Sequence, residues 1–396
     1  MKALYAATLA VVCVITAACS RDYPGGAREM TTLPSGTVGM VAVGVIGEPF
    51  KPSVDRTLVF AFGADGRVLG RLEGDAIWRT ALLASPGRAV TATADAVITV
   101  TTDSHTVQPV DEYQVDAAAQ DPRTGRAALW FNSGVDGPSG YLSRYVSLAP
   151  GRPARLGTLP GRVQSPAYCG DSLYAVVQDY STATAEAKEN RWWLYELAPD
   201  RDPVVRGEWW WPAKAGPGST AVCADDNTAM YVIGAEPAHP DDPDNHDVTL
   251  FRARIDLSNG SREQAPLLDL PANRGYFEAG PVPFEKRLYW STTNGKILST
   301  PMTGPARVTQ QWSLPPADRR EGSSRNETKH AVVGTTFVYL DYTQNTPTFT
   351  TYDMPSGQRL GGPIPLPWLR PLLGKTSESG RSMYTVDAVT ALQPAP

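Results

Sequence analysis

The sequence predicts an all-β protein, a β-propeller built from four-stranded antiparallel blades. Pairs of β-type runs recur along the 396 residues at a nearly regular spacing. Glycine and proline, 35 of each, are spread along the chain, as is typical of many short strands joined by tight turns. No segment shows a sustained apolar helical period, so few helices are expected. The chain is long enough for one large β domain.

The repeating unit is clearest between residues 167 and 211. There the run AYCGDSLYAVVQDY is followed, after a polar insertion, by RWWLYELAPDRDPVVRGEWWW. Two β-type segments are thus followed by two more, with turn residues between them. We therefore expect one four-stranded antiparallel sheet, which is one blade.

A pair formed by an apolar and an aromatic residue marks the first two strands of successive units. The aromatic members are 44 to 58 residues apart, and propeller blades take ~40 to 50 residues each. A second strand pair usually follows, with Gly, Pro, Asn or Asp at its turn. The spacing favours radial repetition over a single sandwich. The six pairs are Leu129-Trp130, Leu173-Tyr174, Met230-Tyr231, Leu288-Tyr289, Val338-Tyr339 and Met383-Tyr384.

The two ends of the predicted domain are interpreted together. Residues 38–46 alternate small and branched side chains, and 57–72 read as two strands around a Gly-Ala-Asp-Gly turn. The last run, 381–392, has strands but no second hairpin after it. We expect it to join the first strands in one composite blade, which closes the ring and removes exposed sheet edges.

The number of blades depends on the front of the chain. Residues 89–102 form a strand pair, although Ile98 lies only 32 residues before Trp130. Counting this pair as a blade predicts seven blades over 37–392, with six or eight as alternatives. Residues 393–396 are a tail.

The N-terminus has the features of an export signal. Lys2 precedes the apolar stretch 3–15, which is too short to span a bilayer comfortably. The following run Thr16-Ala17-Ala18-Cys19 resembles the lipobox of bacterial lipoproteins. This resemblance implies that Cys19 becomes the first residue of the mature chain and carries lipid, including palmitate. The alternative is an ordinary secretory signal with cleavage near Ala18.

These features define the expected domain organisation before the propeller. Residues 1–18 are the signal peptide, and 19–36, polar and rich in Gly and Pro, are a flexible tether. The predicted location is the extracytoplasmic face of the cell membrane, through the lipid on Cys19.

Two cysteines remain after Cys13 is lost with the signal and Cys19 is lipidated. Cys169 and Cys223 each lie shortly before the apolar-aromatic pair of their unit, so they occupy similar places in adjacent blades. In an oxidising compartment we predict a disulfide that joins the two blades. The alternative is two buried free thiols.

Charge and motifs disfavour several classes of function. The formal net charge is -5 and no Lys/Arg cluster stands out, so nucleic acid is not an expected partner. The motifs GxSxG, SxxK, HExxH and CxxC are absent from the sequence. The four histidines are scattered over the predicted blades.

An acidic, proline-rich segment over 236–247 is expected to be a surface loop. Carboxylates are the ligands that Ca²⁺ prefers, but their spacing here matches no EF-hand. A solvated loop is the favoured interpretation and calcium the alternative; no other cofactor is predicted. The candidate ligands are Asp241, Asp242, Asp244 and Asp247.

Five of the ten tryptophans lie at 192–193 and 209–211. Exposed indoles could form a platform for sugar rings. However, adjacent strand residues point to opposite faces, so Trp209 and Trp211 share one face and Trp210 takes the other. Because both faces of a blade are covered by its neighbours, we favour a packing role.

One segment resembles a known propeller repeat. Ala119, Asp121, Thr124, Gly125 and Trp130 are similar to the repeat A-x-D-x-x-T-G-x-x-x-W of pyrroloquinoline-quinone-type propellers, with Trp130 one residue late. The resemblance implies the propeller fold and a tryptophan that docks neighbouring blades. More broadly, the chain resembles bacterial lipoproteins with quinoprotein-like or WD40-like propellers, and its composition is similar to that of actinobacterial proteins.

We therefore expect a lipid-anchored, monomeric propeller that works by binding, as a scaffold or receptor for an envelope protein, peptide or glycan. The competing class is a secreted propeller enzyme, of hydrolase, lyase or lactonase type, with its site at the mouth of the central channel. No catalytic residue can be named from the sequence.

Overall fold

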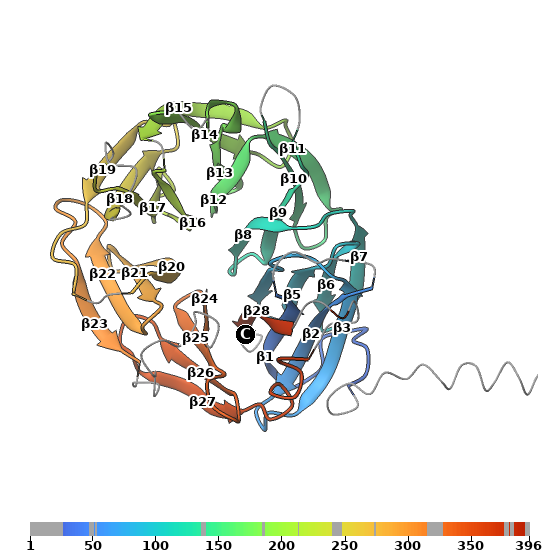
Figure 1. Cartoon of the computed structure of the whole chain (residues 1–396). Helices are drawn as coiled ribbons and strands as arrows, with labels where there is room; N and C mark the ends of the chain where they lie inside the picture. Colours follow the sequence, from blue (N-terminus) through green and yellow to red (C-terminus); the bar gives the residue numbers. More distant parts are fainter. Residues whose placement is uncertain are drawn as a thin grey trace, which may run out of the picture.

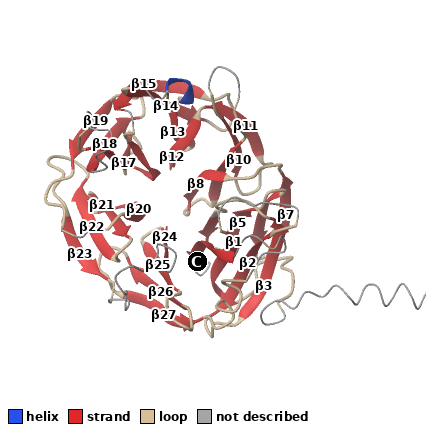
Figure 2. Cartoon of the chain, in the orientation of Figure 1, coloured by secondary structure: helices blue, strands red, loops and turns tan. Residues whose placement is uncertain are grey.

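The computed structural model describes residues 27–46, 51, 54–135, 140–183, 187–212, 214–239, 248–272, 275–314, 328–375, 380 and 384–392. These residues form seven four-stranded antiparallel sheets arranged as radial blades around a central axis (Figure 1). In the described part, one short 3₁₀ helix, η3 (Tyr180–Thr182), interrupts an otherwise all-β chain (Figure 2). The predicted fold class and the count of seven blades are confirmed.

The first blade is composite, as predicted. Its strands, from the axis outward, are β28 (Tyr384–Ala391), β1 (Thr37–Val45), β2 (Arg56–Gly63) and β3 (Val68–Asp75). The C-terminal strand thus pairs antiparallel with the N-terminal one and closes the ring. The contact extends to Trp368, whose indole N–H donates to the Gly66 carbonyl at 2.9 Å.

The other six blades follow in chain order, and the strands of each are given from the axis outward. The second blade has all four strands between Leu82 and Pro109, so the short interval seen in the sequence is a compact blade. The blades are β4 (Leu82–Ser85), β5 (Arg88–Ala92), β6 (Ala96–Thr101) and β7 (His105–Pro109); β8 (Val115–Asp121), β9 (Arg126–Asn132), β10 (Leu142–Leu148) and β11 (Arg155–Pro160); β12 (Arg162–Cys169), β13 (Ser172–Gln178), β14 (Glu189–Leu197) and β15 (Val204–Pro212); β16 (Gly216–Cys223), β17 (Ala229–Pro237), β18 (Val248–Asp256) and β19 (Arg262–Pro266); β20 (Phe277–Phe284), β21 (Arg287–Thr292), β22 (Lys296–Pro301) and β23 (Thr309–Ser313); β24 (Thr328–Val333), β25 (Thr336–Asp341), β26 (Thr348–Asp353) and β27 (Arg359–Pro365).

The apolar-aromatic pairs lie on the second strand of the third to seventh blades. In each of these strands the apolar member is fully or nearly fully buried, because the second strand is covered by strands on both sides and by blades on both faces. The sixth pair differs. Tyr384 begins the innermost strand of the composite blade, and Met383 lies outside the described residues.

The tryptophan cluster packs between the fourth and fifth blades. Trp192, Trp209 and Trp211 are buried together with Phe251 of the fifth blade. The packing role is therefore correct for these three. It is wrong for Trp210. This side chain points to the other face of the outermost strand β15 and is 46% exposed. Blades diverge toward the rim of a ring, so outer strands are covered less than inner ones.

The prediction of a flexible tether over residues 19–36 is wrong for its second half. Met30 and Leu33 are buried against the first two blades. The Met30 N–H donates to the Arg71 carbonyl at 2.8 Å, and the Leu33 N–H donates to the Thr101 carbonyl at 2.7 Å. Polar composition suggested a free segment, but its two large apolar residues attach it to the ring. Residues 19–26 lie outside the described residues.

A β-bulge interrupts the closing strand. Ala42 pairs with Ala388 and Val43 with Val386, so Asp387 is the extra residue. Its carboxylate lies over Gly44, where a Cβ would collide with it. Burial raises the pKa of Asp387 to about 7, although Lys329, a Thr80 backbone hydrogen bond and Arg79 act in the opposite direction.

Candidate functional site

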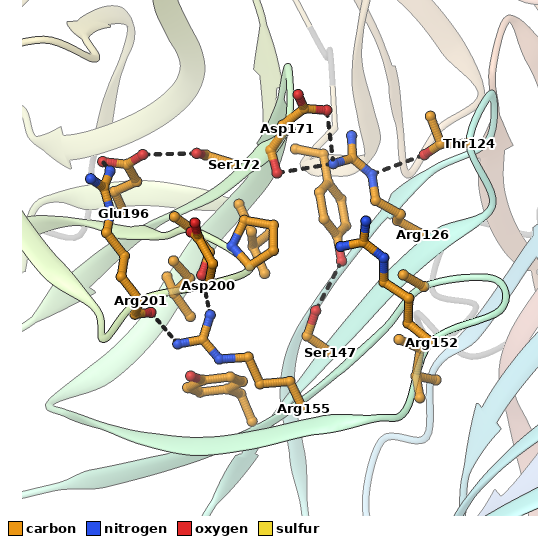
Figure 3. Close-up of a pocket in the computed structure, with 18 of the residues that line it drawn as sticks. Thr124, Arg126, Ser147, Arg152, Arg155, Asp171, Ser172, Glu196, Asp200 and Arg201 are labelled. Atoms are coloured by element: carbon orange, nitrogen blue, oxygen red, sulfur yellow. Dashed lines mark hydrogen bonds and ion pairs between the residues drawn. The ribbon is translucent and has the colours of Figure 1, made fainter.

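A groove of about 950 Å³ lies between the third and fourth blades (Figure 3). One wall is the turn between β10 and β11, residues 149–154, and the other is the turn between β14 and β15, residues 198–203. Arg126, Tyr145 and Tyr168 also line it. The volume is within the range of small-molecule and peptide sites.

Both walls begin as turns that the sequence predicts. Pro150-Gly151 and Pro199-Asp200 lie at the tips of the second hairpins of their blades. Gly151 has φ 69°, a conformation that a glycine adopts without strain. The two turns face each other because equivalent hairpins of adjacent blades end on the same side of the ring.

Arg155 attaches one wall to the other. Its guanidinium, on β11, donates to the carbonyls of Ala198 and Arg201 in the turn of the next blade. Carbonyl groups of a tight turn point outward and otherwise need water as a partner. The contact therefore holds the fourth-blade turn in place and sets the width of the groove.

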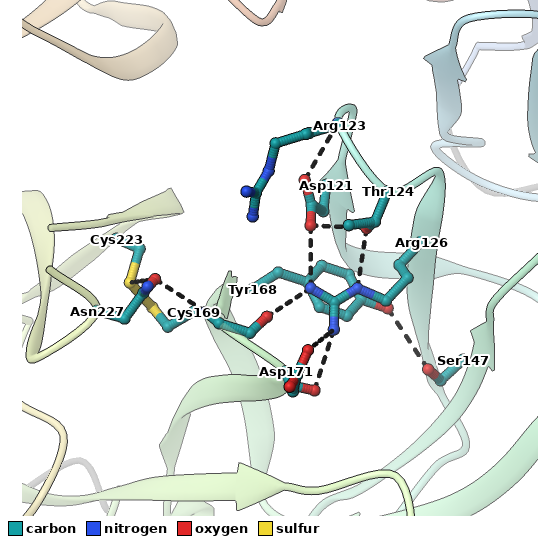
Figure 4. A network of polar contacts seen from close by, with 11 residues as sticks. Asp121, Arg123, Thr124, Arg126, Ser147, Tyr168, Cys169, Asp171, Cys223 and Asn227 are labelled. Carbon is teal, nitrogen blue, oxygen red and sulfur yellow. Dashed lines mark hydrogen bonds and ion pairs between the residues drawn. A yellow bond between two sulfur atoms is a disulfide. The ribbon is translucent and has the colours of Figure 1, made fainter. Parts of the chain in front are cut away.

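Arg126 also joins the third blade to the fourth (Figure 4). It donates to the Gly170 carbonyl at 2.5 Å and to the Asp171 carbonyl at 3.0 Å, and it pairs with Asp121 at 2.9 Å. Its guanidinium also lies over the Tyr168 ring, 4.8 Å from the centroid. This one side chain connects the first turn of the third blade to the first turn of the fourth.

The segment that resembles the quinone-type repeat builds this arginine site. Although burial alone raises the pKa of Asp121, hydrogen bonds from Thr124 and Arg126 hold it below its usual value, so the carboxylate stays charged. Gly125 completes the turn with φ 70°. Trp130 is fully buried in a cluster shared by the third and fourth blades, in agreement with the docking role that the resemblance implies.

Donation from one blade to a turn carbonyl of the next is a recurring contact that the sequence analysis missed. The donors are arginines or tryptophans, and each lies in the blade that precedes the accepting turn. A search for strand arginines one blade before each turn would have suggested the arginine donors. The further cases are Arg88 to Gly125 at 2.5 Å, Arg252 to Gly304 at 2.8 Å and Trp312 to Met354 at 2.9 Å.

Glu196 is neutralised within the groove. Its carboxylate accepts from Ser172 at 2.8 Å and pairs with Arg201 at 2.8 Å, and Arg206 is a further partner. Burial raises the pKa of Glu196, but these hydrogen bonds outweigh it and the pKa is lowered. Glu196 and Arg201 are therefore used by the fold, not left for a ligand.

Three charged groups of the groove have little or no internal pairing. In the described part of the chain, no hydrogen bond or ion pair involves the Arg152 guanidinium or the Asp200 carboxylate. The carboxylate of Asp171 is fully exposed and its nearest cation, the Arg126 guanidinium, is 3.9 Å away. The groove is thus lined by one guanidinium and one carboxylate without an internal partner, Arg152 and Asp200, and by the exposed, weakly paired carboxylate of Asp171.

The predicted disulfide is present and lies beside the groove. Cys169 ends β12 and Cys223 ends β16, with their Cα atoms 5.4 Å apart, so the bond joins the innermost strands of the fourth and fifth blades. The next residue, Gly170, donates its N–H to the Asn227 side chain at 2.9 Å. The turn that carries Asp171 is therefore held by the disulfide, by Asn227 and by Arg126 (Figure 4).

A polar network holds the same two blades at the other end of β8. The buried carboxylate of Asp116 accepts from Tyr141 and from Gln114, the latter at 2.8 Å, and pairs with Arg162 at 3.4 Å. Burial raises the pKa of Asp116 despite these partners. The network belongs to the blade interface, because Tyr141 and Arg162 come from the third and fourth blades.

The central channel contains a second cavity of about 500 Å³. Its walls are mostly small apolar side chains of the innermost strands. Ser291 and His330 lie near it with Oγ and Nδ1 3.2 Å apart, but Ser291 is fully buried, so its hydroxyl is not accessible to a substrate. Over the described ranges, no group of three or more His, Cys, Asp or Glu could hold a metal ion.

Several predicted site residues cannot be placed. Cys19 and the four candidate calcium ligands, Asp241, Asp242, Asp244 and Asp247, lie outside the described residues. The loop itself is shorter than expected, because Glu236 and Pro237 pair with Thr249 and Val248 and belong to the hairpin. None of the helices in the described ranges is long and apolar enough to cross a membrane.

Comparison with known proteins gives no family assignment. No family model matches the chain, and no curated protein matches it. Among solved structures, apo AztD from Citrobacter koseri is 13% identical with a TM-score of 0.43, over 82% of this chain and 94% of that one. A protein from Lactobacillus plantarum is 11% identical with a TM-score of 0.47, over 90% of this chain and 100% of that one.

Proposed function

We propose that this propeller is an extracytoplasmic, lipid-anchored binding module, a monomer whose ligand is an envelope protein, peptide or glycan. The observation that carries the proposal is the groove between the third and fourth blades. Its walls are fixed by contacts between blades, yet the charges of Arg152 and Asp200 have no partner within the described residues, and the exposed Asp171 carboxylate has only a 3.9 Å contact with Arg126. Unused charges on a rigid concave surface are typical of a binding site.

The rigidity of the groove supports binding. Arg126, Arg155 and the Cys169–Cys223 disulfide fix the turns before a ligand arrives. A site that is already ordered loses less conformational entropy when it binds. The groove can therefore bind without the cost of ordering its walls.

Filling the groove tests the proposal. Ala149 lines the groove and is half-buried, so Ala149→Trp places an indole between the walls without removing an internal contact. We expect the immobilised Ala149→Trp chain to capture at least about tenfold less of its ligand from a detergent extract of cell envelopes, by quantitative mass spectrometry. The wild-type chain defines the captured component.

Thr303→Trp is the matched control. Thr303 is exposed in the equivalent turn of the sixth blade, between β22 and β23, and far from the groove in the ring. This variant should capture as much as the wild type. Equal capture by Ala149→Trp and the wild type would place the binding surface elsewhere.

The anchor has its own test. Replacing Cys19 by Ala removes the proposed lipid attachment site, so we expect the protein to move from the membrane fraction to the soluble fraction on cell fractionation. Cys13→Ala, a change within the proposed signal peptide, should leave it in the membrane fraction. Membrane retention of the Cys19→Ala protein would contradict the anchor.

A further inference from the structure

We propose that the groove selects a protein segment that carries both an acidic and a basic side chain. The acidic group would bind Arg152 of the third blade, and the basic group would bind Asp171 or Asp200 of the fourth. This inference rests on the proposed function, because it names the ligand class of the same groove.

The first step is the pairing of the groove's own charges. Four arginines line the groove: Arg126, Arg152, Arg155 and Arg201. Arg126 and Arg155 are bound to turn carbonyls of the next blade, and Arg201 is bound to Glu196. Arg152 is the guanidinium that remains, and in Figure 3 it extends from its turn toward the interior of the groove.

The second step concerns the two acidic groups of the fourth blade. Asp200 lies in the turn between β14 and β15, and Asp171 lies in the turn between β12 and β13. Both carboxylates are exposed, and they belong to the fourth blade, whereas Arg152 belongs to the third. A ligand between the walls therefore meets a positive group on one side and negative groups on the other.

This arrangement discriminates between charge classes. A polyanion such as a nucleic acid or a polyphosphate would gain one contact with Arg152 and would be repelled by Asp171 and Asp200. A neutral ligand would cover Arg152 and Asp200 without giving either of them a partner, which is unfavourable. A segment with one group of each sign satisfies both walls.

The aromatic groups of the groove favour a peptide over a glycan. Sugar rings bind proteins by stacking on exposed aromatic faces. Tyr145 is buried, and the face of Tyr168 is covered by the Arg126 guanidinium. The rim instead carries Pro150, Pro153 and Pro199, which offer rigid apolar contacts to a peptide main chain.

The test uses the full chain and a phage-displayed library of random heptapeptides. We expect the selected peptides to contain an acidic and a basic residue at a constant spacing. Replacing the acidic residue by its amide in a synthetic selected peptide should weaken binding by about tenfold. The variant Arg152→Glu should lose the same peptide and should select peptides with a basic residue at that position.

Arg359→Glu is the control for the charge change. Arg359 is exposed on β27 of the seventh blade, so this variant should select the same peptides as the wild type. Arg152 is also exposed and makes no contact that the fold needs, so thermal unfolding should be unchanged in both variants.

The outcomes separate the inference from the function. Selected peptides without a charge preference, or a preference that Arg152→Glu does not move, would overturn the inference. So would binding of oligogalacturonate, a polyanionic glycan, in place of peptides. In each of these cases envelope capture that is sensitive to Ala149→Trp would still support the function, whereas loss of both results would overturn the function as well.

Discussion

Removal of the Cys169–Cys223 disulfide is expected to lower the free energy of unfolding by about 4 kcal/mol. The bond closes a loop with a sequence separation of 54 residues between the innermost strands of two blades. In the chain-entropy model, opening a loop of that length increases the entropy of the unfolded state by an amount equivalent to about 4 kcal/mol at 25 °C. The double variant Cys169→Ala/Cys223→Ala should show this loss in urea denaturation.

Reduction provides the matched control for this prediction. A reducing agent should destabilise the wild type to a similar extent and should leave the double variant unchanged. The double variant should also capture less of the envelope ligand whose binding Ala149→Trp blocks, because the disulfide precedes the turn that carries Asp171. Equal stability of wild type and double variant under oxidising conditions would show that the bond does not constrain the unfolded chain.

The second large effect concerns Asp387 and depends on pH. Burial raises the pKa of Asp387 to about 7 in the folded protein, against ~3.9 in an unfolded chain. Between these values the folded state holds a proton that the unfolded state has lost. The destabilising contribution of Asp387 should therefore be absent below about pH 4, grow as the pH rises, and reach its full size above about pH 7.

Asp387→Asn removes this penalty because the amide stays neutral at every pH. We expect the variant to be more stable than the wild type by about 2 to 4 kcal/mol at pH 8, and to differ little from it at pH 4. The measurement is the urea midpoint at the two pH values.

Asp103→Asn is the control for this substitution, since Asp103 is exposed in the turn after β6. It should change stability by no more than about 0.5 kcal/mol at either pH. A destabilised Asp387→Asn protein at pH 8 would mean that the ionised carboxylate, and not the neutral acid, is the form that the bulge accommodates.

Much of the fold could be predicted because its determinants are local. Each pattern that predicts the repeat lies within a single blade. These patterns are the strand pairs, the turn residues and the apolar-aromatic pairs of residues 129–339. The composite blade and the disulfide follow from the repeat, since a ring has no ends and equivalent positions of adjacent blades are neighbours. The errors concern Trp210 and the segment from Met30 to Leu33, whose burial depends on the shape of the rim.

The candidate site could not be predicted in the same way. Its turns at Pro150 and Pro199 were expected, but no local pattern shows that Arg155 reaches from one to the other, or that Arg152 remains unpaired. Those facts depend on the distance and angle between blades, which are set by packing of the whole ring.

The sequence by itself thus determined an all-β ring of repeated blades, and it favoured seven blades, closure by the two ends and one disulfide, which the structure confirms. Only the tertiary structure decided which charges are used between blades and which face the groove. It also decided that Asp387 is the residue that bulges, since the register between β28 and β1 joins strands from opposite ends of the chain. Strand and turn preferences act over a few residues, whereas pairing of charges requires groups that only the closed ring brings together.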